Sequence, residues 1–277
     1  GSVVLANVGD LARTTGTFSD GALKSHDEEM IPNPAAESLS PPTEPGPTPV
    51  YVTPRVIAMD GRAEAPGVAI SEAVTTFVES TAADWGWRPT VAVTFYLHGT
   101  RSGYSDGIEA TLGIPLSDAD RTYYETSTAA VAIRRDVLTG GRAVVIKLEQ
   151  ADGTLMGLEV ARVVLAHEYT HVMQFDFVSR IEPAWFVEGM ADVVAFSNFP
   201  DGLGLYGYSV SIPAALSNGT MPSLRSLHED WSSYSGQLSL VYVTSYYAVN
   251  FLANRIGGQG ILQILSDVDA GASFEDA

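Results

Sequence analysis

The chain contains no cysteine and very little lysine. The absence of cysteine excludes both disulfide bonds and thiolate metal sites, and it leaves the redox compartment open. Lys24 and Lys147 are the only lysines, and the 33 acidic and 15 basic residues leave a formal net charge of −18. Because phosphate contacts need clustered basic residues, this balance argues against nucleic acid and against an anionic membrane surface as partners.

Long hydrophobic runs are also missing. No apolar stretch approaches the roughly 20 residues of a membrane-spanning helix, so we expect no membrane span. No signal peptide is evident, and the opening Gly1-Ser2 without an initiator Met is typical of a sequence whose natural start has been removed. We therefore expect a secreted, cell-surface or periplasmic protein whose targeting signal is not visible in this sequence.

The remaining composition is that of a globular protein preceded by a Pro-rich segment. With 277 residues, of which 45% are hydrophobic and 17% charged, the chain can bury a sizeable core. We expect a Pro-rich segment over residues 1–54 and one folded domain over residues 55–277. The first segment holds eight of the 15 prolines, at Pro32, Pro34, Pro41, Pro42, Pro45, Pro47, Pro49 and Pro54.

Two interpretations of the Pro-rich segment stay open. It can be a solvated tail or extended tether, as its composition suggests. Alternatively it is a pro-segment that crosses a neighbouring cleft, which would make the protein a zymogen. In that case the groups able to reach a metal ion and displace its water are His26, Asp27, Glu28 and Glu29.

Hydrophobic periodicity predicts strands early in the domain and helices later, which indicates an α+β fold with two lobes. The N-terminal lobe would hold a mixed β-sheet, and the C-terminal lobe would be mainly helical. Strand 143–148 is expected to border the substrate cleft as an edge strand to which a peptide can add. Segment 118–135 fits either a helix or irregular structure. Strands are predicted at 90–97 and 143–148, and helices at 69–85, 158–177, from Pro183, at 238–255 and after Gly257-Gly258.

The most informative pattern is the string His167-Glu168-Tyr169-Thr170-His171, which lies in an apolar, helix-patterned run. Residues i and i+4 share one helix face, so His167 and His171 can offer two imidazole nitrogens to one metal ion. Glu168 lies beside them and can polarise a metal-bound water. The alternative is a pair of surface histidines on an ordinary amphipathic helix. The apolar flanks argue against it, because three ionisable groups on a buried helix need compensation.

A second phrase supplies a third ligand. Glu188 follows in the run from Trp185 to Asp192 and is expected to complete a site for one Zn²⁺ per chain. Two histidines and one carboxylate leave a fourth position for water, as in a catalytic zinc site. Asp192, one turn after Glu188, can hold the second ring nitrogen of a ligating histidine. Its alternative role is that of a surface or capping residue.

These two phrases resemble those of the gluzincin branch of zinc metallopeptidases, which includes thermolysin-like and M1-like (peptidase MA-like) enzymes. The phrase AWFVEGMAD is similar to the glutamate helix of the M1-like peptidases. The resemblance covers about residue 91 to the C-terminus. It implies a zincin-like, two-lobed metallopeptidase domain in which His167, His171 and Glu188 are the zinc ligands, Glu168 is the catalytic base and Asp192 orients a ligating histidine.

The expected reaction is hydrolysis of a peptide bond by a zinc-bound water that Glu168 deprotonates. The oxyanion of the tetrahedral intermediate needs a further donor, and Tyr or His suits this role at neutral pH. By resemblance to a V-Y phrase of the M1-like enzymes, Tyr242 is the first candidate. Tyr246 and, by analogy with thermolysin-like enzymes, His228 are the alternatives. Simple core packing is the competing role for the tyrosines.

The expected substrate is a peptide or protein, cut internally. M1 aminopeptidases carry a G-x-M-E-N phrase that grips a free N-terminus, and this chain lacks it near Ala143 to Leu148. Glu149 is the one candidate replacement, and as a lone acid after a strand it is expected to be solvated. The alternatives to an endopeptidase are an aminopeptidase of the same family and a non-catalytic scaffold that binds zinc.

Overall fold

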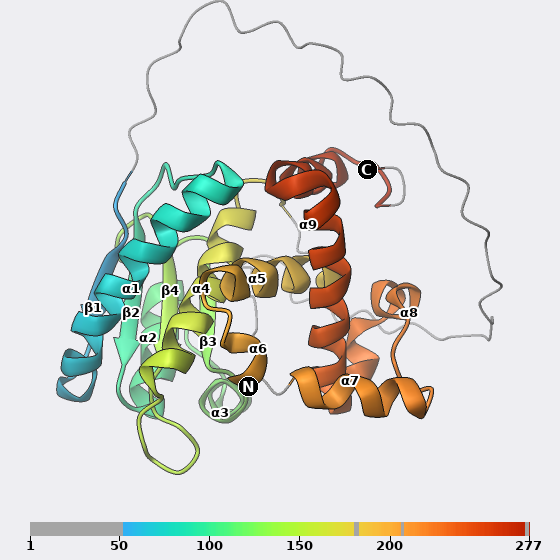
Figure 1. The fold of residues 1–277 in the computed structure, drawn as a ribbon. Coiled ribbons are helices and arrows are strands. Elements are labelled where there is room, and N and C mark those ends of the chain that lie inside the picture. Colours follow the sequence, from blue (N-terminus) through green and yellow to red (C-terminus); the bar gives the residue numbers. More distant parts are fainter. Residues whose placement is uncertain (1–51, 180–182, 206–207, 275–276) are drawn as a thin grey trace, which may run out of the picture.

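The computed structural model describes residues 52–179, 183–205, 208–274 and 277. The expectations for residues 1–54, including the contact of His26, Asp27, Glu28 and Glu29 with the cleft, therefore fall almost wholly outside the described residues. Over the described residues the protein is α+β: an N-terminal mixed four-stranded sheet with its helices is followed by a helical region (Figure 1). No helix in this part of the chain has the length and apolarity that crossing a membrane requires.

The elements of the N-terminal region alternate more than the sequence patterns suggest. Three helices are interleaved with the strands, whereas strands first and helices later were expected. Segment 118–135 resolves into a helix followed by a strand. The elements in chain order are β1 (Arg55–Ala58), α1 (Gly61–Trp85), β2 (Val93–His98), α2 (Arg101–Leu112), α3 (Asp118–Ser127), β3 (Ala130–Ile133), β4 (Arg142–Lys147) and α4 (Leu158–Gln174).

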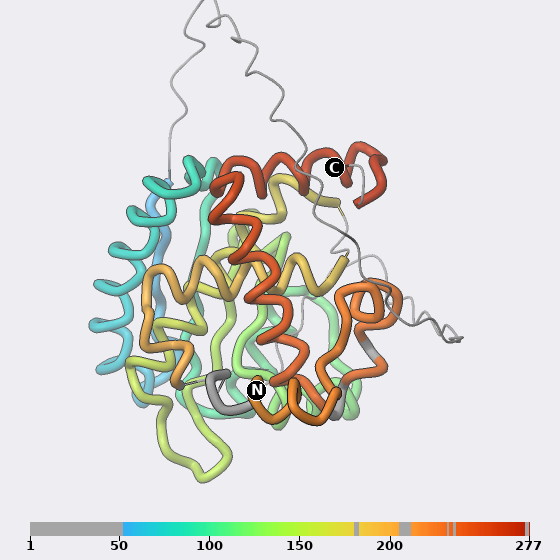
Figure 2. The backbone as a smooth tube through the Cα atoms, turned by 45° about the vertical axis from the view of Figure 1, so that its right-hand side comes forward, coloured from blue at the N-terminus to red at the C-terminus, as the bar shows by residue number. Residues whose placement is uncertain are grey.

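The helical region begins after α4, the helix that holds His167 and His171. Pro183 is the N-cap of the first helix of this region. The helix therefore begins at Ala184, one residue later than predicted. The long last helix has non-helical backbone angles at Gly257, which confirms the predicted break there, and the helix changes direction along its course (Figure 2). The elements are α5 (Ala184–Asn198), α6 (Gly202–Leu205), α7 (Tyr208–Ser217), α8 (Leu224–Glu229), the 3-10 helix η1 (Trp231–Gln237) and α9 (Leu238–Asp269).

The strand order β1-β2-β4-β3 corrects the expected position of strand 143–148. β4 is not an edge strand, because it pairs with β2 in parallel and with β3 antiparallel. Its continuous apolar sequence has a simple cause. Val144 and Ile146 point into one core, and Ala143 and Val145 into another, so both faces of the strand are covered. β3 is the edge strand on this side of the sheet.

Two cores flank the sheet. The larger one lies between one face and helices α1, α4, α5 and α9, with Phe77, Phe95 and Tyr169 packed together at its centre. The smaller core lies between the other face and helices α2 and α3, and includes Tyr104 and Tyr124. α4 therefore lies beneath the sheet, and α5 lies between α4 and α9 (Figure 1).

Close packing of α5 on α9 depends on one glycine. A Cβ atom at Gly189 would lie 2.4 Å from the carbonyl oxygen of Ser245 on α9. Only a residue without a side chain allows the two helix backbones to approach this far. Because Gly189 directly follows Glu188, this contact also fixes the position of that carboxylate relative to α9.

Candidate metal centre

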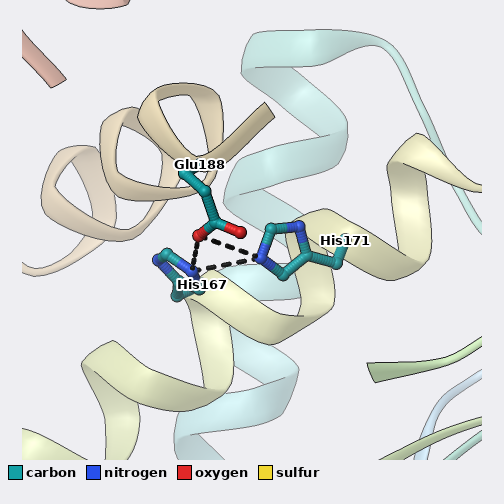
Figure 3. A group of neighbouring side chains, drawn as sticks. All are labelled: His167, His171 and Glu188. Carbon is teal, nitrogen blue, oxygen red and sulfur yellow. Dashed lines mark hydrogen bonds and ion pairs between the residues drawn. The ribbon is translucent and has the colours of Figure 1, made fainter. Parts of the chain in front are cut away.

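Three buried side chains from two helices converge on one point. His167 and His171 lie one turn apart on α4, and Glu188 reaches them from α5 (Figure 3). The Nε2 atoms of the two histidines are 3.1 Å apart, and Glu188 Oε2 lies 3.2 Å from His167 Nε2 and 3.7 Å from His171 Nε2. Ligand atoms at about 2.1 Å from one tetrahedral ion would be about 3.4 Å apart. The group therefore has the spacing and chemistry of a metal site.

The electrostatics of the three groups also suit a cation. Burial raises the pKa of Glu188, but His171 and His167 outweigh it and hold the pKa at about 2. Burial lowers the pKa of His167, but the carboxylates of Asp192 and Glu188 outweigh it and raise that pKa well above its ordinary value. The two carboxylates thus favour positive charge at this point, and a divalent cation would supply it.

Each histidine is held through its second ring nitrogen. Asp192 Oδ1 lies 2.9 Å from His167 Nδ1, so the aspartate is buried beside a proposed ligand and not on the surface. Since the carboxylate can only accept, Nδ1 of His167 carries the hydrogen and its Nε2 faces Glu188 and His171.

The partner of His171 is Gln174, which the sequence reasoning missed. Gln174 Nε2 donates to the backbone carbonyl of Val187 at 2.8 Å, and its Oε1 lies 2.7 Å from His171 Nδ1. A carbonyl can only accept, so the amide nitrogen faces Val187 and the amide oxygen accepts from His171. Gln174 thereby leaves the Nε2 lone pair of His171 free for a metal. Its position three residues after His171, on the same face of the helix, was the available signal.

Glu168 is fully buried next to the three candidate ligands. Burial raises its pKa to about 7, and the neighbouring histidines partly oppose this. The backbone amide of Ala132 on β3 approaches the carboxylate and has a small lowering effect on its pKa. Even so, neither carboxylate oxygen has a partner at normal hydrogen-bond geometry among the described residues. A buried carboxyl group in this condition costs on the order of several kcal/mol of stability.

The three candidate donors for an oxyanion lie in different places. Tyr242 is buried on α9 with its ring centroid 6.4 Å from that of His167, and it lines the same cavity. Burial, followed by the charges of Glu188 and Asp192, raises the pKa of Tyr242 well above its ordinary value, so it keeps its proton. Tyr246 packs against Phe196, outside the lining of the cavity.

His228 is also outside the group of candidate ligands. It lies on α8 with its ring centroid 6.0 Å from that of Phe274, and it does not line the cavity that His167 and Tyr242 share. The structure therefore brings together His167, His171, Glu188, Glu168, Asp192 and Tyr242, and leaves Tyr246 and His228 elsewhere.

The cavity beside the proposed ligands has a volume of about 710 Å³. One wall is formed by α4, α5 and the start of α9, and includes His167, Asp192 and Tyr242. The opposite wall runs from the end of α3 to the loop after β4. Glu149 lines this wall, but its oxygens accept from Arg62 Nη1 at 3.0 Å and from the backbone amide of Arg101 at 2.9 Å. It is therefore paired, and the expectation of a solvated acid was wrong.

We compared the chain with protein-family models, with curated proteins and with solved structures. None of these comparisons found a match.

Proposed function

We propose that the protein is a zinc-dependent endopeptidase with a zincin-like arrangement, in which His167, His171 and Glu188 hold one Zn²⁺. The observation that carries this proposal is the burial of Glu168, unsatisfied, beside the three converging ligands. A purely structural metal site needs no such carboxylate, and retaining one lowers stability. A general base for hydrolysis needs a carboxylate in this position. This is also the reason to prefer an enzyme over a metal-binding scaffold.

Each residue of the site would have a separate role in hydrolysis. When bound, the metal would supply a Lewis acid and lower the pKa of a coordinated water. Glu168, with a pKa near 7, can take a proton from the attacking water and pass it to the leaving amine. Asp192 and Gln174 keep the two imidazoles oriented. Tyr242 holds a phenolic proton beside the site and can donate it as a hydrogen bond to the oxyanion.

Strand β3 gives a place for the peptide backbone. The amide of Lys147 donates to the carbonyl of Ala129, across the antiparallel pair of β3 and β4. Backbone groups alternate in direction along such a strand, so those of Ala130 and Ala132 point away from β4. The approach of the Ala132 amide to Glu168 agrees with this alternation. Ala130 itself is fully buried, but Ala129, which directly precedes β3, lines the cavity, so a peptide held there would lie against the start of this strand, near the proposed metal.

The pairing of Glu149 favours an endopeptidase over an aminopeptidase. To bind a free amino terminus, a carboxylate in the cleft needs an oxygen that is not already satisfied. Both oxygens of Glu149 already accept hydrogen bonds from donors on α1 and α2. It therefore serves to hold the wall of the cavity in place.

The experiment compares the parent protein with the Glu168→Gln variant. The parent, loaded with zinc, should cleave an unfolded, dye-labelled protein, and a chelator should stop the reaction. Glu168→Gln should bind about one zinc per chain by elemental analysis and lose at least about 10²-fold in turnover, because only the base is removed. A zinc-loaded parent that cleaves no unfolded protein or peptide would leave the scaffold function in its place. A Glu168→Gln variant with parental turnover would contradict the assignment of the base.

A further inference from the structure

The wall of the cavity opposite the metal ligands carries an unusual cation. The protein has only two lysines in a chain of net charge −18, and one of them, Lys147, lines this cavity while only 7% exposed. Lysine is among the residues least often buried, since removing its charge from water is costly without a partner. The position of Lys147 therefore calls for an explanation.

No carboxylate of the described residues compensates this charge directly. Lys147 Nζ donates to the backbone carbonyls of Glu125 at 2.6 Å and Tyr124 at 3.3 Å, and it forms no salt bridge. Nζ also lies 5.6 Å from the ring centroid of Tyr104, and its third hydrogen has no oxygen acceptor among the described residues. Burial, together with the nearby charge of Arg101, lowers the pKa of Lys147 to about 8, although the charges of Glu125 and Glu149 partly oppose this, so the amine is still mainly protonated at neutral pH.

The carboxylates that share this wall have other donors. Glu149 is held by Arg62 and by the backbone amide of Arg101, and Glu125 accepts a hydrogen bond from the hydroxyl of Ser105 at 2.6 Å. The guanidinium of Arg101 donates to the carbonyl of Gln150 and forms no salt bridge with a described carboxylate. The wall thus presents two cations, Lys147 and Arg101, that are not paired with acids of the protein.

We propose that Lys147, assisted by Arg101, binds a carboxylate of the peptide substrate, so that the enzyme prefers an acidic group at one position near the cleaved bond. The inference rests on the proposed peptidase function, because it assigns one part of that cleft to one class of substrate. A carboxylate entering the cavity would use the remaining hydrogen of Lys147 and form the direct ion pair that Glu125 and Glu149 do not form with it. The competing role is structural, since a cation at the C-terminal end of α3 also stabilises that helix.

The experiment uses zinc-loaded protein and pairs of peptides with amidated ends. Each pair differs only in Glu against Gln, placed in turn at each position flanking the cleaved bond. One position should show kcat/KM higher for Glu by about tenfold or more, the usual gain from a hydrogen bond to a charged group. A further neutral peptide, compared as free acid and as amide, shows whether the chain terminus or a side chain supplies the carboxylate.

Variants then assign the preference to the side chain. Lys147→Met, similar in length and without charge, should remove the preference while cleavage of the Gln peptide stays within about twofold. Lys147→Arg should retain the preference. Arg225→Met, an exposed change on α8 with the same loss of charge, should leave it intact. The unfolding temperature of each variant is measured alongside, because a purely structural role would lower stability and slow all peptides equally.

The outcomes separate this inference from the function on which it rests. Cleavage with no acidic preference at any position, or a preference that survives in Lys147→Met, would overturn the carboxylate subsite alone. Because the parent is tested first, this holds even if Lys147→Met does not fold. If the zinc-loaded parent cleaves no peptide of the set, the peptidase function fails and the subsite fails with it.

Discussion

At the residue scale, Gln174 joins the two helices that carry the proposed ligands. One end of its amide accepts from His171 on α4, and the other donates to the carbonyl that precedes Glu188 on α5. Gln174→Leu removes both bonds while keeping a similar volume. We expect zinc affinity, measured by competition with a chromophoric chelator, to fall by about 10–100-fold. Gln263→Leu, the same change at an exposed position of α9, should leave the affinity unaltered. Equal affinity in both variants would contradict this role.

Two tyrosines one turn apart on α9 provide a matched pair. Tyr242 lines the cavity beside His167, whereas Tyr246 packs on Phe196. Tyr242→Phe should lower kcat by about 10²-fold with unchanged zinc content, the usual effect of one lost oxyanion donor. Tyr246→Phe should have little effect on kcat. If Tyr246→Phe lowers kcat and Tyr242→Phe does not, Tyr246 is the oxyanion donor. The measurement is kcat from initial rates on one peptide.

At the element scale, β3 is the strand on which peptide binding would depend. Ala129 directly precedes β3 and lines the cavity, so Ala129→Leu places a larger side chain where a peptide would lie along this strand. We expect KM for peptides of eight or so residues to rise several-fold, while zinc content stays at the parental level. The comparison is with a dipeptide-length substrate, which is too short to pair along the strand and should be affected much less. Equal effects on both substrates would exclude docking on this edge.

At the scale of the whole molecule, the proposed metal would connect the sheet-bearing region to the helical region. Its ligands come from α4, which packs under the sheet, and from α5, which packs on α9. A ligand that binds only the folded state stabilises it by about 4 kcal/mol at a thousandfold excess over Kd. For a domain of this size that corresponds to roughly 10 °C in Tm.

Chelation of the metal should therefore lower Tm in calorimetry by about this amount, and added zinc should restore it. In Glu188→Ala, the chelator should cause no further decrease, since the site has already lost a ligand. A Tm that does not depend on zinc in the parent would show that these helices are held together without it.

Features that depend on neighbours along the chain can be predicted from the sequence alone. The spacing of His167 and His171 follows from helical periodicity, and an apolar run identifies β4 as a strand. The order of the strands, by contrast, depends on contacts between distant segments. A strand with this apolar run can lie at the edge or in the centre of a sheet. Only the folded structure shows that both faces of β4 are covered and that it pairs on both sides.

Which side chains lie in the same space depends on the packing of segments that are far apart in the sequence. Glu188 reaches the histidines, and Gln174 reaches Val187, because α5 packs across α4. Tyr242 lies at the cavity whereas His228 lies against Phe274, although both are polar aromatic residues downstream of Glu188. The sequence does not indicate a binding role for Lys147. That proposed role depends on its burial in the cavity wall and on the pairing of the nearby acids with other donors. Burial and pairing are properties of the assembled fold.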